Sequence, residues 1–231
     1  MKKSILLVAL ILTGSVVFAQ SYTYENQAYA QAAEQANRGE KIKQFPADFY
    51  FDSACAEQTE KQNDRCNLSL LIKQRYEAYG ESFEDAYNYS AALLSVPETG
   101  IYFKLPLEQA EQARKILKQM IEVNPNAIET YRLLDLAYEY IIFGQRRSDD
   151  YTICSRYYEN FETASVQEYA AHQKEAYARL ALLEKRIALH DENLSYSDYM
   201  EAGLINEAIG RHAMADMYYE MSRNAGCENQ D

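Results

Sequence analysis

Three histidines and four cysteines are the residues of this chain whose side chains could do metal or nucleophilic chemistry. The histidines are His172, His190 and His212, and none of them lies within one helical turn of another. They therefore do not form a zinc-ligand pattern such as two histidines four residues apart. Catalysis by a cysteine would require a free thiol. We expect no metal and no cofactor, and we interpret the histidines as ordinary helical residues.

The four cysteines suit an oxidising compartment, where disulfides form and persist. Four cysteines allow three pairings, and we favour Cys55 with Cys66 and Cys154 with Cys227. The first bridge would close a short polar stretch, and the second would tie a mid-chain segment to the C-terminus. A metal site is the alternative, but the cysteine spacings match no zinc motif.

Other catalytic patterns are missing from the sequence. It contains no nucleophile elbow, no phosphate-binding glycine loop and no dinucleotide fingerprint. The acidic pairs Glu84-Asp85 and Asp149-Asp150 join neighbours that point in different directions on a helix, so we interpret them as solvated faces or caps. We expect a protein that is not an enzyme. A cell-wall hydrolase whose carboxylates converge from distant helices stays an alternative.

The first nineteen residues have the pattern of a signal peptide. Lys2 and Lys3 precede an unbroken apolar run over 5–12, and small or apolar residues at 17–19 predict cleavage before Gln20. An uncleaved anchor is the alternative, but the run falls short of the roughly 20 apolar residues that span a bilayer. The prediction is therefore a signal peptide over 1–19, a mature chain in the periplasm or secreted, and no transmembrane span in that mature chain.

The composition is acidic, with a net charge of −12 for the whole chain. Such a surface argues against binding to nucleic acid and to anionic lipid. It favours a protein or peptide partner, which would be basic if charge decides the contact. Residues 20–231 are long enough for one domain with a real core.

Helical periodicity dominates the chain after the signal segment and predicts an all-α fold. We expect less regular structure over 20–81, with helices near 28–36 and 68–79. Further helices should begin at Ser82 and Pro106. Capping boxes predict two more, one from Asn126 with Glu129 and one from Ser165 with Glu168, the latter running to about His190. A last helical pair should extend from about Ser197 to Ser222.

The segment 195–228 has the residue spacing of a helical repeat. Its small and large positions are Tyr199, Ala202, Gly203, Gly210, Ala215, Tyr219 and Ser222. This segment resembles the tetratricopeptide repeat family. The resemblance implies that Gly203 and Ala215 stand where two antiparallel helices touch, while Tyr199 and Tyr219 fill the space between them.

A partial match to the same family covers 106–140. Ala113 and Leu117 resemble one unit's second helix, and Tyr131, Leu134 and Tyr138 resemble the next unit's first helix. The pattern departs at Asp135, where the family has glycine, and Cys227 stands where the terminal proline of the other unit would be. The fold prediction is thus a disulfide-stapled helical-hairpin array, repeat-like over 82–228, with an irregular helical bundle as the alternative.

Tyrosine is unusually abundant, with 21 residues and no tryptophan. Two close pairs, Tyr138 with Tyr140 and Tyr157 with Tyr158, should not be able to face inward together on one helix. We predict that they form a binding surface, because tyrosine is enriched at recognition sites.

The sequence as a whole predicts an exported, non-enzymatic adaptor of the bacterial cell envelope that recognises a protein or peptide. Repeat-like helical pairs build grooves that bind such segments. An inhibitor or immunity protein that neutralises a basic, cell-wall-degrading toxin or enzyme is the alternative within the binding class.

Overall fold

The computed structural model describes residues 64–79, 82–95, 105–144 and 158–226, together with residues 31, 34, 35 and 44. Of residues 64–70, 79, 158–163 and 226 only the backbone is described. Eight helices are delimited in this part of the chain, which contains no strand. The all-helical prediction is therefore confirmed for these residues.

None of the helices in the described ranges is both long enough and apolar enough to cross a membrane.

The chain gathers into two compact units, of which the first contains α2 (Asp64–Tyr79) and α3 (Phe83–Leu94). Helix α3 begins as predicted, because Ser82 is its N-cap and its Oγ accepts a hydrogen bond from the Asp85 backbone N–H at 3.4 Å. The two helices are joined by an ion pair between Arg75 and Asp85 at 3.0 Å. The stacked rings of Tyr76 and Tyr89, 4.6 Å apart, add an aromatic contact.

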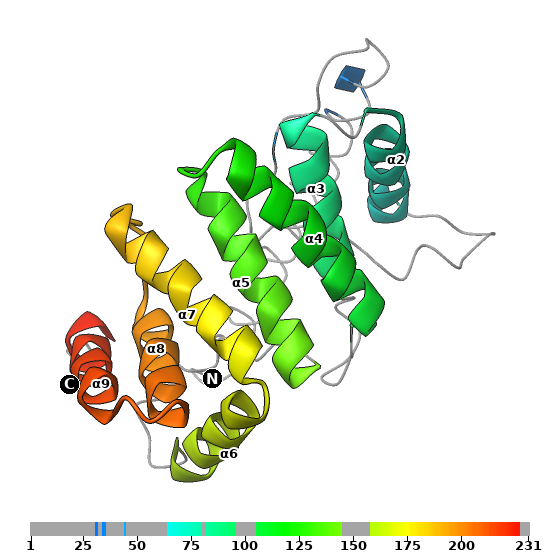
Figure 1. Cartoon of the computed structure of the whole chain (residues 1–231). Coiled ribbons are helices and arrows are strands. Elements are labelled where there is room, and N and C mark those ends of the chain that lie inside the picture. The colour runs from blue at the N-terminus through cyan, green and yellow to red at the C-terminus, as the bar shows by residue number, and fades with distance from the viewer. Residues whose placement is uncertain are drawn as a thin grey trace, which may run out of the picture. The chain divides into compact units, whose positions relative to one another are not determined.

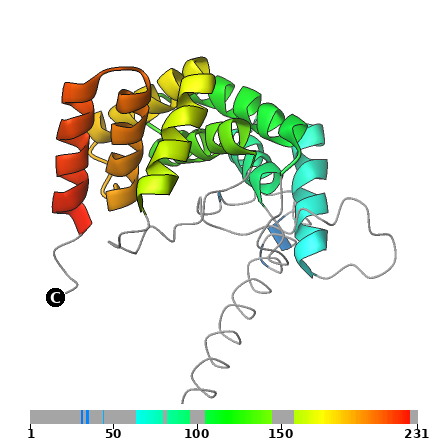
Figure 2. The ribbon, with the colours of Figure 1, turned by 90° about the horizontal axis from the view of Figure 1, so that it is seen from below.

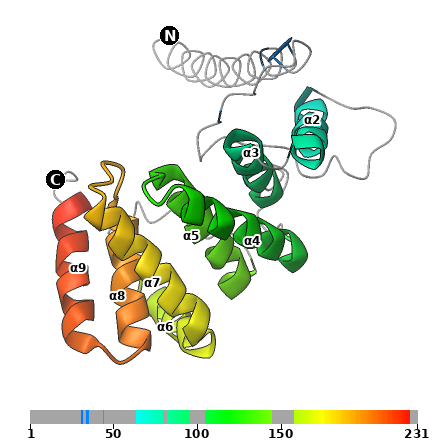
Figure 3. The same ribbon diagram turned by 45° about the horizontal axis from the view of Figure 1, so that its top comes forward.

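The second unit contains six described helices. They are α4 (Leu107–Val123), α5 (Ile128–Phe143), α6 (Tyr158–Ala171), α7 (Gln173–Ala188), α8 (Tyr196–Ala208) and α9 (His212–Gly226). Helix α5 packs against α4, α6 and α7, whereas α8 packs against α6, α7 and α9 (Figures 1 and 3). Helix α7 thus touches both α5, which packs on α4, and α8, which packs on α9.

The central place of α5 corrects the expectation that Tyr138 and Tyr140 could not both face inward. Both side chains are buried, each 2% exposed, although they point in different directions on the helix. The expectation that both could not face inward assumed a helix with one buried face. Because α5 has neighbouring helices on several sides, more than one of its faces is covered.

The start of α5 also differs from the capping-box prediction. Its N-cap is Ala127, and no side chain caps the helix. The Asn126 backbone N–H instead donates to Asn124 Oδ1 at 3.3 Å, and the Tyr131 hydroxyl donates to the Pro125 carbonyl at 2.9 Å. The turn is therefore held by its own local hydrogen bonds rather than by a cap from Asn126.

The single long helix predicted from Ser165 to about His190 is two helices, α6 and α7. They are separated at His172, whose φ of −116° and ψ of 47° are not helical. Ser165 lies inside α6 and is buried, so it caps nothing. The break lets the two segments take different neighbours, since α6 packs mainly on α8 and α7 packs mainly on α5.

The last two helices form the hairpin that carries the repeat resemblance (Figure 2). Asp198 Oδ2 accepts a hydrogen bond from the Ser195 backbone N–H at 2.8 Å, which fixes the start of α8. The ring of Tyr219 occupies the space where a side chain at Gly203 would stand, and Ala215 is 2% exposed. Gly210 meets nothing at its Cβ position, and its φ of +77° makes it a turn glycine rather than a packing one.

The predicted disulfides fall on Cys55, Cys154 and Cys227, which lie outside the described residues, and on Cys66, of which only the backbone in α2 is described. The pairing stays a prediction.

The C-terminus of α7 carries backbone strain at His190. This exposed residue has a φ of +54°, the left-handed conformation that helix ends usually give to glycine. Replacing His190 with glycine should raise the free energy of unfolding by about 0.5–1 kcal/mol. Urea denaturation at neutral pH measures this change. His172→Gly is the matched control, because its φ is negative, and it should lower stability or leave it unchanged.

Candidate functional site

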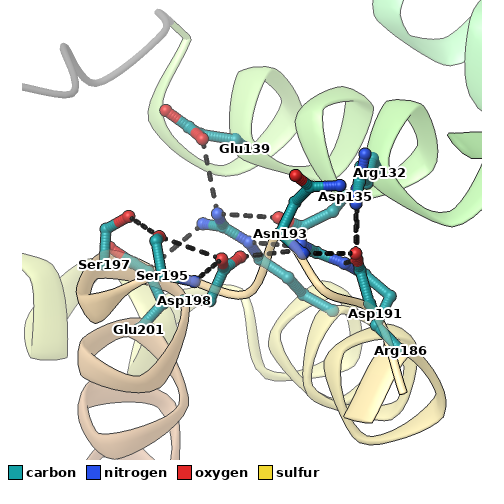
Figure 4. A network of polar contacts seen from close by, with 11 residues as sticks. Arg132, Asp135, Glu139, Arg186, Asp191, Asn193, Ser195, Ser197, Asp198 and Glu201 are labelled. Atoms are coloured by element: carbon teal, nitrogen blue, oxygen red, sulfur yellow. Dashed lines mark hydrogen bonds and ion pairs between the residues drawn. The ribbon is translucent and has the colours of Figure 1, made fainter. Parts of the chain in front are cut away.

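Arg179 of α7 is the centre of a buried polar cluster, with its side chain 5% exposed. Its Nε donates to Asp135 Oδ1 at 2.8 Å, and its Nη2 donates to Glu139 Oε2 at 3.3 Å, both on α5. Its Nη1 donates to the Tyr169 hydroxyl of α6 at 2.6 Å and to Glu201 Oε2 of α8 at 3.4 Å. One guanidinium therefore links four helices, and Figure 4 shows its carboxylate partners Asp135, Glu139 and Glu201.

The electrostatics of Arg179 follow from burial and from its partners. Burial by itself would lower the pKa of this guanidinium, but the surrounding carboxylates, with Asp135 foremost, hold the pKa well above its ordinary value. The Tyr169 hydroxyl, which accepts from Arg179, also donates to Glu201. Each buried polar group of the cluster thus has a partner, as such groups require.

A second part of the cluster surrounds Asp191, in the loop between α7 and α8. Asp191 Oδ2 accepts from Arg186 Nε at 2.8 Å and from Arg132 Nε at 3.1 Å. Arg186 also donates to Asp198 Oδ1 at 2.8 Å, and the Asn193 backbone N–H donates to Asp191 Oδ1 at 3.0 Å. These bonds tie the loop to α5 and α7 and fix where α8 begins (Figure 4). We call the two parts together the arginine frame.

The hydrogen bonds to Asp191 give the stability a defined pH dependence. Burial would raise the pKa of this carboxyl, but the bonds from Arg132, Arg186 and the Asn193 backbone outweigh it and lower the pKa to about 2. A carboxyl whose folded-state pKa is depressed adds stability above its unfolded pKa, and this stability is lost as the pH falls through the folded pKa. Asp191 is thus fully stabilising above about pH 4 and loses its effect toward pH 2.

We expect the free energy of unfolding to fall by up to about 2 kcal/mol from Asp191 between pH 4 and pH 2. Asp191→Asn should be less stable at neutral pH, and its stability should change less over that acid range. Urea unfolding at several pH values measures both slopes. Parallel curves for the two proteins would show that Asp191 is not the group responsible.

The arginine frame consists of arginine–carboxylate ion pairs that hold helices together. It brings carboxylates together from separate helices, as the hydrolase alternative requires, but it gathers them around arginines. A general acid must carry a proton that it can donate to a substrate in a cleft. None of the frame's carboxylates lines the cleft that lies between α4 and α7. Among the described residues, no group of three or more histidine, cysteine, aspartate or glutamate side chains is placed to hold a metal ion.

A cleft of about 600 Å³ lies between α4 and α7, a volume in the range of ligand pockets. Helix α5 contributes one residue to it, Tyr138. The remaining lining comes from α4 and α7, and consists of Glu111, Gln112, Arg114, Lys115, Lys118, Lys174, Glu175 and Ala178.

The charge of this cleft is opposite to that of the protein. Four cations line it against two carboxylates, whereas the chain as a whole is at −12. Arg114 is engaged, since it pairs with Glu111 and its guanidinium carbon lies 5.8 Å from the centre of the Tyr138 ring. Lys115, Lys118 and Lys174 are exposed, and none of them forms an ion pair with a described residue. We call these three residues the lysine triad.

The structure places the predicted site residues in different surroundings. Tyr199 and Tyr219 pack against a hydrophobic core to which α5, α6, α7, α8 and α9 all contribute. Tyr138 and Tyr140 are both buried, and Tyr138 also lines the cleft. Tyr157 lies outside the described residues, and only the backbone of Tyr158 is described.

Sequence reasoning missed the lysine triad. Two of its members, Lys115 and Lys118, were visible three residues apart on the polar side of a predicted helix. Their proximity to Lys174 depends on the packing of α4, α5 and α7, which no local pattern gives.

Comparison with known proteins gives no relative on which to base a function. No protein-family model matches the chain, and no curated protein is significantly similar to it. We therefore infer the function from the cleft and from the frame that holds it.

Proposed function

We propose that this chain is an exported, non-enzymatic binding protein of the bacterial cell envelope that recognises another protein or a peptide. The observation that carries the proposal is the cleft between α4 and α7, bordered by three lysines that have no carboxylate partner among the described residues. Exposed charges that are not paired within a protein are available to a partner, where they set specificity and association rate.

The arginine frame supports a binding role because it fixes one wall of the cleft. Helix α7 carries Lys174 and, on the same helix, Arg179 and Arg186, which are bonded to α5 and α8. Fully satisfied buried polar networks make the arrangement of helices rigid and unique. A cleft whose wall is held in this way is pre-organised, so less ordering accompanies binding.

The fold that we propose for this function is a repeat-like helical array closed by the α8–α9 hairpin. The small residues at the helix contact and the tyrosine that fills the neighbouring space are consistent with a tetratricopeptide-like unit. Such arrays bind partners along their surfaces. The signal-peptide pattern at 1–19, which lies outside the described residues, supports the proposal that the protein acts in the periplasm or outside the cell.

The cleft favours an adaptor over an inhibitor of a basic enzyme. An inhibitor of that kind would offer an acidic surface to its target, whereas the cleft offers mostly cations. The partner that we propose therefore differs in charge from the basic partner that the overall composition suggests.

Photo-crosslinking in the native host tests the proposal. A photoreactive amino acid in place of Gln112, at the cleft, should give a discrete adduct with another protein. The same amino acid in place of Ala213, exposed on α9, is the matched control and should not give that adduct. An adduct of equal yield at both positions, or none at Gln112, would contradict recognition through the cleft.

A further inference from the structure

We propose that the cleft between α4 and α7 binds an extended acidic peptide segment, whose carboxylates contact the lysine triad. This inference rests on the proposed function and adds the chemical class of the partner. Three features of the cleft support the inference: the position of the lysines, the hydroxyl of Tyr138, which has no hydrogen bond with a described residue, and the two carboxylates in the lining.

The lysine triad is arranged as two neighbouring charges faced by a third. Lys115 and Lys118 are three residues apart on α4, so their side chains leave the same face of that helix. Lys174, near the start of α7, lines the same cleft from the other helix. The protein has 35 acidic residues for 23 basic ones, so carboxylates are in excess. No lysine in the described part of the chain, Lys73 and Lys185 included, forms an ion pair with another described residue, so the triad is distinguished by its position: three such lysines line one cleft.

Tyr138 supplies a polar contact within the cleft. Its side chain is 2% exposed, and its hydroxyl forms no hydrogen bond with a described residue. This hydroxyl is not one of the buried polar atoms that lack a partner; it opens into the cleft that the residue lines, where its O–H is a hydrogen-bond donor. A carboxylate or carbonyl oxygen of a peptide in the cleft would accept this bond. Arg114 lies over the ring and is paired with Glu111, so the ring is held in position.

The two carboxylates of the cleft favour a peptide over a dense polyanion. Glu111 and Glu175 would repel a polymer that carries a negative charge on every unit. A peptide can instead direct its side-chain carboxylates to the lysines and its backbone N–H groups to the glutamates. The unpaired cations are also all lysines, which act as point charges, whereas arginine provides the planar fork suited to phosphate.

The overall negative charge of the protein does not prevent this contact. At physiological ionic strength, charges more than about 8 Å apart are largely screened when they are exposed to solvent. An acidic segment inside the cleft is therefore governed by the nearby cations. The affinity should fall as salt is added, because the same screening weakens these contacts.

Binding of a defined peptide to the mature protein tests the inference. The probe is a fluorescently labelled octapeptide of alternating glutamate and serine, and the comparison peptide has glutamine in place of each glutamate. Changing all three residues of the lysine triad to glutamine should weaken binding about tenfold or more. Lys73→Gln, an exposed lysine of α2 outside the cleft, is the matched control and should bind like the unmodified protein.

Tyr138→Phe provides a second variant that keeps the packing of the ring. It should weaken binding of the glutamate peptide about two- to tenfold and leave thermal unfolding nearly unchanged, since the hydroxyl has no bond to lose within the described protein. Normal peptide binding by both the triad variant and Tyr138→Phe would overturn the inference, as would equal binding of the glutamine peptide.

Sodium polyphosphate distinguishes the peptide from a polyanion. Tighter binding of polyphosphate than of the glutamate peptide, lost in the triad variant, would overturn the peptide class and assign the cleft to an anionic polymer. Failure of the acidic-peptide inference can be distinguished from failure of the proposed function. A protein adduct at Gln112 in cells together with no binding of the acidic peptide would leave the binding role standing and refute the acidic partner.

Discussion

Replacing Arg179 with methionine should lower the free energy of unfolding by about 3–5 kcal/mol at neutral pH. Methionine fills much of the same volume but leaves Asp135, Glu139 and Glu201 without the guanidinium that they share. Breaking a buried ion pair by removing one partner is costly, because the remaining charges are left uncompensated in a medium that solvates them poorly. Urea unfolding at neutral pH measures the loss.

Two comparisons make this prediction specific. The loss should be smaller at pH 5 than at pH 7, because carboxylates that have lost their cation take up protons more readily. Arg223→Met, at an exposed position of α9, is the matched control and should change stability by no more than about 0.5 kcal/mol. A loss at Arg179 no larger than at Arg223 would show that the frame does not hold α5, α7 and α8 together.

The parts of the fold that could be predicted from the sequence are those with local signals. Helices with strong local signals were placed well: α3 begins after the cap at Ser82, and α4 begins after Pro106. The break at His172 had no such signal. It arises because α6 and α7 pack against different helices, and packing partners distant in sequence are not visible in a local pattern.

The polar residues of the site were harder to predict for the same reason. The apolar stripe of a helix identifies its buried face, but Asp135, Arg179 and Glu201 are charged residues that are buried together. Each of them resembles a surface residue when its own helix is considered alone. Only the meeting of α5, α7 and α8 brings them within bonding distance, and the lysine triad likewise depends on α4 and α7 lying on either side of one cleft.

The second large effect is expected at Gly203, in the α8–α9 hairpin. Gly203→Leu should lower the free energy of unfolding by an amount toward the upper end of about 1–3 kcal/mol, although leucine is the better helix former. The ring of Tyr219 occupies the place of the new Cβ. That ring cannot swing aside without cost, because its hydroxyl donates to Glu207 at 2.6 Å. Thermal and urea unfolding measure the loss.

The same contact predicts a change of sign when Tyr219 is removed. In the unmodified protein Gly203→Ala should destabilise, because even one methyl group meets the ring. In a Tyr219→Ala background the space is open, and Gly203→Ala should become neutral or stabilise by up to about 1 kcal/mol through helix propensity. The two effects would then be strongly non-additive, as expected for residues in contact. If Gly203→Ala stabilised both backgrounds equally, Gly203 would not be the position where α8 and α9 touch, and the case for a repeat-like hairpin would lose its basis.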